Sequence, residues 1–165
     1  MYTTDLMKLV EVTKKLTAIV LEDDPETNEL MCDAFENFFK KVYSAFEGET
    51  ALEQYKKYQP DVIFIDIILP GKSGLEIAEE IKAINPKQII IIVSASDDMG
   101  DITRAVELGV NGFIRKPINT DKLIDVLNDM VSDIERERRK FKRILKKRLK
   151  KELQKELRKE LDFRY

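Results

Sequence analysis

Five apolar segments, each followed by residues with helical spacing, constrain the fold of this chain more than any other feature of its sequence. Three of them, residues 17–21, 61–65 and 88–94, are rich in β-branched residues and are apolar almost throughout rather than at alternate positions. Strands of this kind are buried on both faces, as in a parallel sheet that helices cover on both sides. The shorter segments at 42–45 and 112–115 suit the edges of that sheet. The sequence therefore predicts an α/β fold of five βα units.

The distribution of charge divides the chain into a body and a tail. Its 165 residues allow one domain of ordinary size with an appendage. Residues 135–165 hold 15 basic and 6 acidic residues, whereas residues 1–134 hold 14 basic and 25 acidic residues. We therefore expect an acidic body at 17–131 and a basic helical tail at 132–165 that continues the last helix of the body. An N-terminal extension at 1–16 is expected to be a short helix.

The apolar residues of the tail keep helical spacing well beyond the body. They alternate by four and three as far as Ile144 and then fall at every fourth residue, at Leu145, Leu149, Leu153, Leu157 and Leu161. No Gly or Pro follows Pro117, so nothing local ends the helix that begins near Asn119 or Thr120. A four-residue spacing shifts the stripe by about 40° per step, which a straight two-stranded coiled coil cannot follow. We expect one long helix that mediates self-association.

Two residue types that catalytic sites often use are scarce. The chain has no histidine and one cysteine, Cys32, which excludes a Ser-His-Asp triad, imidazole metal ligands and an internal disulfide. It has no signal-peptide pattern and no apolar run approaching the roughly 18 residues of a membrane-spanning helix. We therefore expect a cytoplasmic protein whose chemistry depends on carboxylates, hydroxyls and lysines.

Groups of this kind stand where the predicted strands end. Glu22 and Asp23 follow the first strand, and Asp66 follows the third. Ser94 is the last residue of the fourth strand, and Lys116 follows the fifth. The carboxyl ends of parallel strands meet at one edge of an open sheet, so these side chains are expected to lie together. Clustered carboxylates suit Mg²⁺ or Mn²⁺, and the cation leaves Asp66 able to attack a phosphoryl group. Lys116 and Ser94 would bind phosphoryl oxygens, and the product would be an aspartyl phosphate.

Four motifs in this order resemble the receiver domain of two-component response regulators, the CheY-like superfamily. They are VLEDDP at 20–25, DVIFIDIILPGKSGLE at 61–76, IIIIVSA at 89–95 and GFIRKPI at 112–118. The resemblance covers about residues 18–131. It implies a doubly wound (βα)₅ sheet of the flavodoxin-like type with strand order 2-1-3-4-5, and a sensor histidine kinase as the phosphoryl donor.

The resemblance also implies a role for each residue that matches a family motif. Asp66 matches the phosphoacceptor, and Lys116 matches the lysine that the family joins to its proline, here Pro117, by a cis peptide. Ser94 matches the switch hydroxyl and Phe113 the aromatic switch residue. These assignments make the chain a phosphorylation-dependent signalling protein.

A metal site follows from the same resemblance. It implies that Asp23 and Asp66 bind Mg²⁺ directly, that Ile68 supplies a backbone carbonyl, and that Glu22 acts through a metal-bound water. By analogy with the family, Ile68 and Ser96 also border the path by which water reaches an aspartyl phosphate. Neither side chain carries a carboxylate or an amide that would orient that water, so we expect slow self-dephosphorylation.

Three classes of function remain open beyond the phosphorylation itself. We favour a signalling module, an enzyme only toward its own phosphorylation and dephosphorylation, that oligomerises or binds a partner without a DNA-binding output domain. Ten of the fourteen residues at 138–151 are basic and none is acidic, so the alternative is a nucleic-acid or membrane-surface binder acting through the tail. The third class, a phosphotransfer intermediate or phosphatase-type enzyme, is weakened because Ile68 stands where a general-acid aspartate is needed.

Overall fold

A five-stranded parallel sheet forms the centre of the computed structural model, which describes the backbone of residues 2–162 and the side chains of residues 6–162. The strands are β1 (Thr17–Leu21), β2 (Lys41–Ala45), β3 (Val62–Ile65), β4 (Ile89–Ser94) and β5 (Gly112–Arg115). Their order across the sheet is β2-β1-β3-β4-β5, which confirms the predicted topology and places the two shorter predicted strands at the edges.

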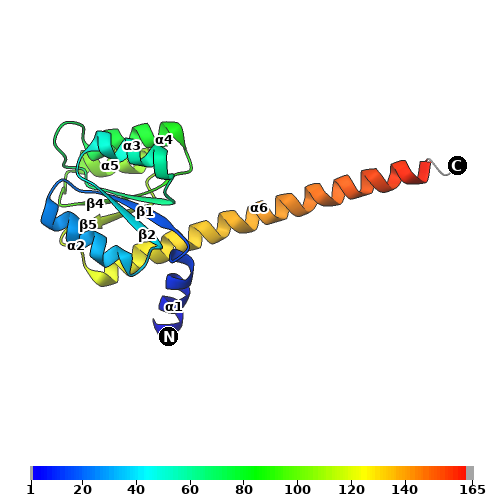
Figure 1. The fold of residues 1–165 in the computed structure, drawn as a ribbon, viewed down its shortest axis with the longest axis horizontal. Helices are drawn as coiled ribbons and strands as arrows, with labels where there is room; N and C mark the ends of the chain where they lie inside the picture. The colour runs from blue at the N-terminus through cyan, green and yellow to red at the C-terminus, as the bar shows by residue number, and fades with distance from the viewer. Residues whose placement is uncertain (1, 163–165) are drawn as a thin grey trace. The chain divides into compact units, whose positions relative to one another are not determined.

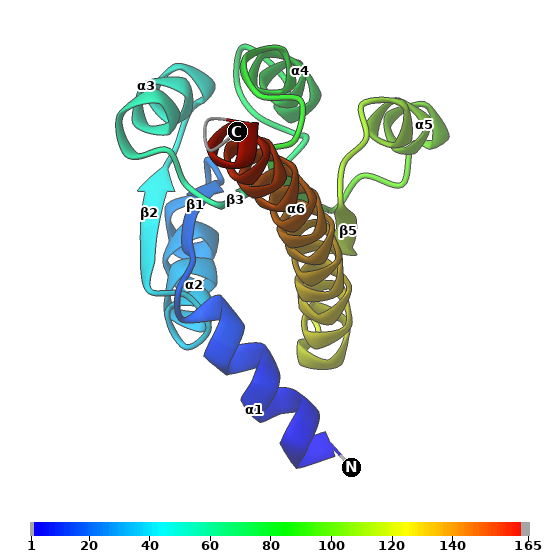
Figure 2. The same cartoon turned by 90° about the vertical axis from the view of Figure 1, so that its right-hand side faces the viewer.

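Within residues 2–162 there are six helices, of which one precedes the first strand and the others connect or follow the strands. They are α1 (Tyr2–Thr13), α2 (Pro25–Glu36), α3 (Gly48–Tyr58), α4 (Gly74–Ile84), α5 (Met99–Glu107) and α6 (Thr120–Asp162). Helices α3, α4 and α5 cover one face of the sheet, and α2 with the first turns of α6 covers the other (Figure 1, Figure 2). Because both faces are covered, every residue of β3 is buried, and so are the last four of β1 and the last five of β4.

Polar side chains start the helices that follow the functional strand ends. Asp24 caps α2 by accepting from the Thr27 amide at 2.9 Å, and the Thr27 hydrogen bonds lower the pKa of the Asp24 carboxyl. Ser73 and Glu76 form a reciprocal capping box at the start of α4. Asn119 accepts from the amides of the residues two and three positions on, and so caps α6. These caps fix where each strand-to-helix loop turns.

Two residues that we predicted within strands lie just outside them. The Asp61 carboxylate accepts from the Thr17 amide at 2.8 Å, and the Asp61 amide donates to the Thr17 carbonyl at 3.0 Å, so Asp61 bonds the start of β1 just before β3 begins. The side-chain amide of Gln88 donates to the Pro60 carbonyl at 3.2 Å and accepts from the Tyr55 hydroxyl. Both polar side chains therefore bond groups at the ends of neighbouring elements, which their local sequence does not indicate.

The chain divides into two compact units, with the boundary between Met130 and Val131. Helix α1 belongs to the first unit and is fastened by a buried Leu9 and by Lys14, whose ammonium donates to the Glu36 carbonyl at 2.7 Å. Residue 1 of the predicted extension and residues 163–165 of the predicted tail lie outside the described residues.

Helix α6 runs without a break for 43 residues, which confirms the single long helix expected from the sequence. No helix within residues 2–162 combines the length and the apolar character needed to cross a bilayer. From Phe141 onwards the large apolar residues of α6 are exposed: Phe141, Ile144, Leu145, Leu149, Leu153, Leu157 and Leu161. These residues form a stripe of exposed apolar side chains along the second half of α6.

Gly74 generates a prediction about the packing of the sheet edge. A Cβ atom at this position would lie 1.9 Å from the Asp66 carbonyl oxygen, a backbone atom that cannot move aside alone. We expect Gly74→Ala to lower the free energy of unfolding by about 1–3 kcal/mol, measured by urea denaturation. The control is Gly100→Ala, where the Cβ would meet only the carboxylate end of the Asp98 side chain. Equal effects of the two substitutions would contradict the close packing at Gly74.

Candidate functional site

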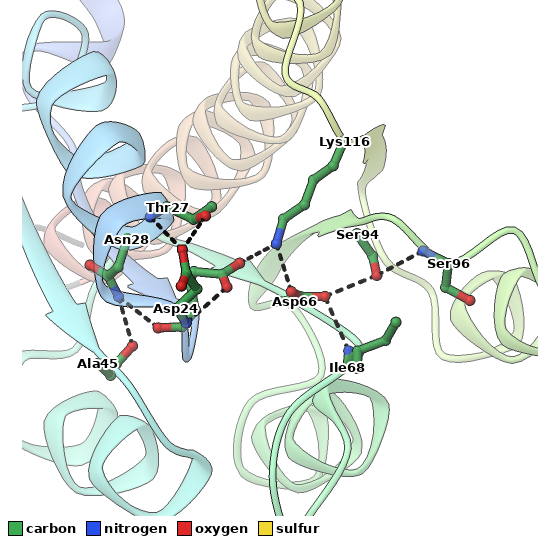
Figure 3. A network of polar contacts seen from close by, with 10 residues as sticks. Asp24, Thr27, Asn28, Ala45, Asp66, Ile68, Ser94, Ser96 and Lys116 are labelled. Atoms are coloured by element: carbon green, nitrogen blue, oxygen red, sulfur yellow. Dashed lines mark hydrogen bonds and ion pairs between the residues drawn. The ribbon is translucent and has the colours of Figure 1, made fainter.

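The polar residues predicted at the strand ends meet at the carboxyl edge of the sheet. Backbone hydrogen bonding continues one residue beyond the ends of β1, β3 and β5. The amide of Glu22 donates to the carbonyl of Ala45, that of Asp66 to the carbonyl of Leu21, and that of Lys116 to the carbonyl of Ser94, all within 3.1 Å. The backbone of each of these three residues is therefore held by the neighbouring strand. Figure 3 shows Asp66, Ser94 and Lys116 joined in one polar network.

Asp66 lies at the centre of this network. Its Oδ1 accepts from the Ser94 hydroxyl at 2.9 Å and from the Ile68 amide at 3.1 Å, and its Oδ2 accepts from the Lys116 ammonium at 2.7 Å (Figure 3). The residue is 6% exposed, so its carboxylate is oriented by protein groups but still reaches the surface. Three donors from separate segments hold the carboxylate in one position.

Lys116 is the cation of the site and contacts two carboxylates at once. Its ammonium bonds both Glu22 and Asp66. Burial alone would lower the pKa of this lysine, but the hydrogen bonds to Asp66 and Glu22 outweigh it and raise the pKa above its ordinary value. Lys116 therefore stays charged at neutral pH.

Glu22 is the most deeply buried acid of the cluster. It is 2% exposed, and this burial raises the pKa of its carboxyl, with the nearby Asp66 acting in the same direction. Hydrogen bonds from Lys116 and from the Asp24 amide act against the shift but do not cancel it. The two buried carboxylates, Glu22 and Asp66, share the ammonium of Lys116.

The acidic group has the composition of a site for a hard divalent cation. Oxygen atoms of Glu22, Asp23 and Asp66 lie within 4.8 Å of one another. Asp23 is exposed, so water can complete the coordination sphere as Mg²⁺ requires. The residues present therefore fit Mg²⁺, and a bound cation would reduce the repulsion among the three carboxylates.

Asn28 supports the site in a way that our sequence reasoning missed. Its side-chain amide is buried and donates to the carbonyls of Glu22 at 2.9 Å and Ala45 at 3.0 Å. These bonds fix the loop that carries the acidic pair. The signal in the sequence is a polar residue on the helix face that also carries the buried Met31 and Phe35.

The remaining predicted residues surround this centre. Phe113 is partly buried and packs against the apolar core. The Ile68 side chain is 61% exposed, and the Ser96 hydroxyl donates to the Asp101 carboxylate at 2.8 Å. The peptide bond between Lys116 and Pro117 is cis, as the resemblance to receivers implies.

The comparison with known families agrees with this fold and this cluster. Residues 18–128 match the model of the response regulator receiver domain. The match covers more than half of the chain, and the chain therefore belongs to this family. Its members are signalling domains of two-component systems, with an aspartate as phosphoacceptor and a Mg²⁺ site.

Relatives and solved structures give the same result. The chain is 31% identical over 111 residues to a chemotaxis protein CheY from Halobacterium salinarum, covering 67% of this chain and 92% of the relative. It is 37% identical over 108 residues to a cyclic di-GMP phosphodiesterase from Thermotoga maritima, covering 66% of this chain but 29% of that protein.

Among solved structures, the N-terminal domain of an uncharacterized protein from Wolinella succinogenes aligns with a TM-score of 0.68 and 34% identity. The alignment covers 74% of this chain and 99% of that one. A chemotaxis protein CheY4 from Vibrio cholerae, at 19% identity and a TM-score of 0.63, shows the same fold.

Proposed function

We propose that Asp66 accepts a phosphoryl group from a sensor histidine kinase, and that the phosphorylated chain signals through self-association in the cytoplasm. The observation that carries the proposal is the position of the Asp66 carboxylate, bonded to Ser94 and Lys116 beside an acidic pair. The carboxylate is the nucleophile, and the residues around it are donors suited to phosphoryl oxygens.

In the proposed reaction an Asp66 carboxylate oxygen attacks the phosphorus of a phosphohistidine. An O–P bond forms as the P–N bond breaks, and the imidazole of the kinase leaves with the electron pair. The Lys116 ammonium neutralises one phosphoryl oxygen, while the hydroxyl of Ser94 donates to another. Asp23, Asp66 and the Ile68 carbonyl would hold Mg²⁺, with Glu22 acting through water, and the cation would supply positive charge toward the phosphoryl oxygens.

The same donors provide a switch. In the unphosphorylated state the Ser94 hydroxyl donates to Asp66 Oδ1. We infer that a phosphoryl group takes over this hydrogen bond and draws Ser94 toward it, and that Phe113 repacks into the space left beside the core. The chain thus catalyses its own phosphorylation and dephosphorylation, and its output is a change of surface.

Phosphorylation is the first prediction of this proposal. With a phosphohistidine kinase or acetyl phosphate and Mg²⁺, the wild-type chain should gain one phosphoryl group, seen by intact mass. Asp66→Asn, which removes the nucleophile but keeps the shape, should gain none, and a chelator should suppress the wild-type reaction. Asp61→Asn, outside the cluster, is the matched control and should be phosphorylated normally. Labelling of Asp66→Asn, or labelling insensitive to chelator, would refute the proposal.

The lifetime of the aspartyl phosphate generates a second prediction. The Ile68 side chain is branched, apolar and exposed beside Asp66, and the Ser96 hydroxyl is already bonded to Asp101. Neither orients a water toward phosphorus, so the double variant Ile68→Asn with Ser96→Glu should lose phosphate at least several-fold faster than wild type under saturating Mg²⁺. An unchanged or slower rate of phosphate release would show that these positions do not control the access of water.

Self-association is proposed from the exposed apolar stripe of α6. Phe141 is 65% exposed and Leu153 64% exposed, in a helix that would otherwise leave seven large apolar residues in water. We expect full-length protein to form a species larger than a monomer at about 50 µM, as measured by light scattering, with a larger fraction associated in the presence of beryllofluoride and Mg²⁺. A monomer under both conditions would exclude this output.

The alternative function is binding of nucleic acid or an anionic membrane surface through residues 138–151. Its support is the density of charge, since ten of these fourteen exposed residues are basic. One aromatic residue, Phe141, lies among them, which gives few platforms for stacking bases. Steeply salt-dependent binding to DNA or anionic vesicles by a monomeric chain would favour this alternative.

A further inference from the structure

An apolar groove lies between α2 and the segment that leads into α6. Its volume is about 610 Å³, and its lining is mostly aliphatic, including Leu30, Met31 and Ala34 of α2 with Pro117, Ile118 and Leu123 on the opposite side. Leu30 is 70% exposed at this groove, a high value for a large apolar side chain. A groove of this size and character can receive the apolar face of a helix.

Helix α2, beside the groove, carries the largest net negative charge of the helices in the first unit, and the first turns of α6 are also acidic. Helix α2 has four acidic residues, Glu26, Glu29, Asp33 and Glu36, and no basic one. Residues 120–130 of α6 add three aspartates against one lysine. The side chains of all seven acids are exposed. Of the helices on the other face, α3 is neutral, α5 has a net charge of −1 and α4 a net charge of −2. The groove therefore combines an apolar floor with acidic surroundings.

We propose that this groove binds the basic segment of α6, residues 138–151, from a second copy of the chain. This inference rests on the proposed self-association and names the surface that accepts the tail. Phe141, Leu145 and Leu149 recur at every fourth residue, are all exposed, and stand among ten basic residues with no acid. An apolar stripe flanked by positive charge complements an apolar floor flanked by carboxylates.

A second molecule is required because of the continuity of α6. The helix that borders the groove at Thr120 and Leu123 is the same unbroken helix that carries Phe141. A helix cannot pack against its own first turns unless it breaks and reverses, and α6 contains no Gly or Pro at which to do so. Reciprocal exchange of tails between two copies uses both grooves and closes the assembly.

The groove also adjoins the proposed phosphorylation site. Ala95 and Lys116 both line the groove. The Lys116 ammonium donates to the Asp66 carboxylate, and Ala95 directly follows Ser94, whose hydroxyl also donates to that carboxylate. A phosphoryl group on Asp66 would take new hydrogen bonds from both donors and so shift two parts of the groove wall. Tail binding should therefore respond to phosphorylation.

The test uses full-length variants, each checked for folding by circular dichroism. Leu30→Asp places a charge in the groove and leaves the tail intact, whereas Phe141→Asp with Leu145→Asp disrupts the tail and leaves the groove intact. Met99→Asp is the matched control, because Met99 is 71% exposed on α5 and lies outside the groove. Light scattering and sedimentation are recorded for each variant alone and for equimolar mixtures, with and without beryllofluoride and Mg²⁺.

We expect Leu30→Asp and the tail variant each to associate at least tenfold more weakly than wild type and Met99→Asp. Their mixture should regain association, because the groove of one meets the tail of the other. If wild type associates and Leu30→Asp associates equally well, the groove is excluded while self-association stands. If wild type is monomeric, the proposed self-association itself fails, and binding of anionic vesicles or DNA by that monomer would assign the tail to another partner.

Discussion

The ion pairs that Lys116 makes with Glu22 and Asp66 are the interactions on which the candidate site depends. They place one cation between two buried carboxylates, with a third acid, Asp23, close by. Such a cluster is stable only if each member is held by backbone and helix caps, because unpaired buried charge is costly. The parallel sheet provides this support by ending its strands side by side. The cluster joins three carboxylates to the ammonium of Lys116, and this composition suits a divalent cation beside a phosphoryl group.

The sequence predicts most of this arrangement. Continuous apolar strands and a capping residue such as Asp24 are local signals, and the meeting of Asp66 with Ser94 and Lys116 follows once the strands are parallel and ordered. What escaped prediction depends on contacts between distant segments. The two hydrogen bonds from Asn28 to the Glu22 and Ala45 carbonyls are of this kind.

Other features missed at the sequence level have the same cause. One is the close approach of Gly74 to the Asp66 carbonyl, and another is the hydrogen bond from the Thr17 amide to the Asp61 carboxylate. Both depend on which elements pack together. The long α6 was predictable because no Gly or Pro interrupts its helical spacing. The apolar stripe of this helix, however, does not indicate which surface would cover it. The groove beside α2, which we propose as that partner, forms only in the folded chain, since Leu30 and Leu123 are 93 positions apart in the sequence.

The central claim is that the charge cluster exists to form an acyl phosphate on one aspartate. Borohydride reduction of the phosphorylated chain tests this directly, because it reduces an aspartyl phosphate to homoserine and leaves free carboxylates unchanged. Tandem mass spectrometry then locates the reduced residue. We expect reduction at position 66 and at none of the neighbouring acids, Glu22, Asp23 and Asp24. Reduction at one of those acids, or a stable phosphate on a hydroxyl such as that of Ser94, would contradict the account.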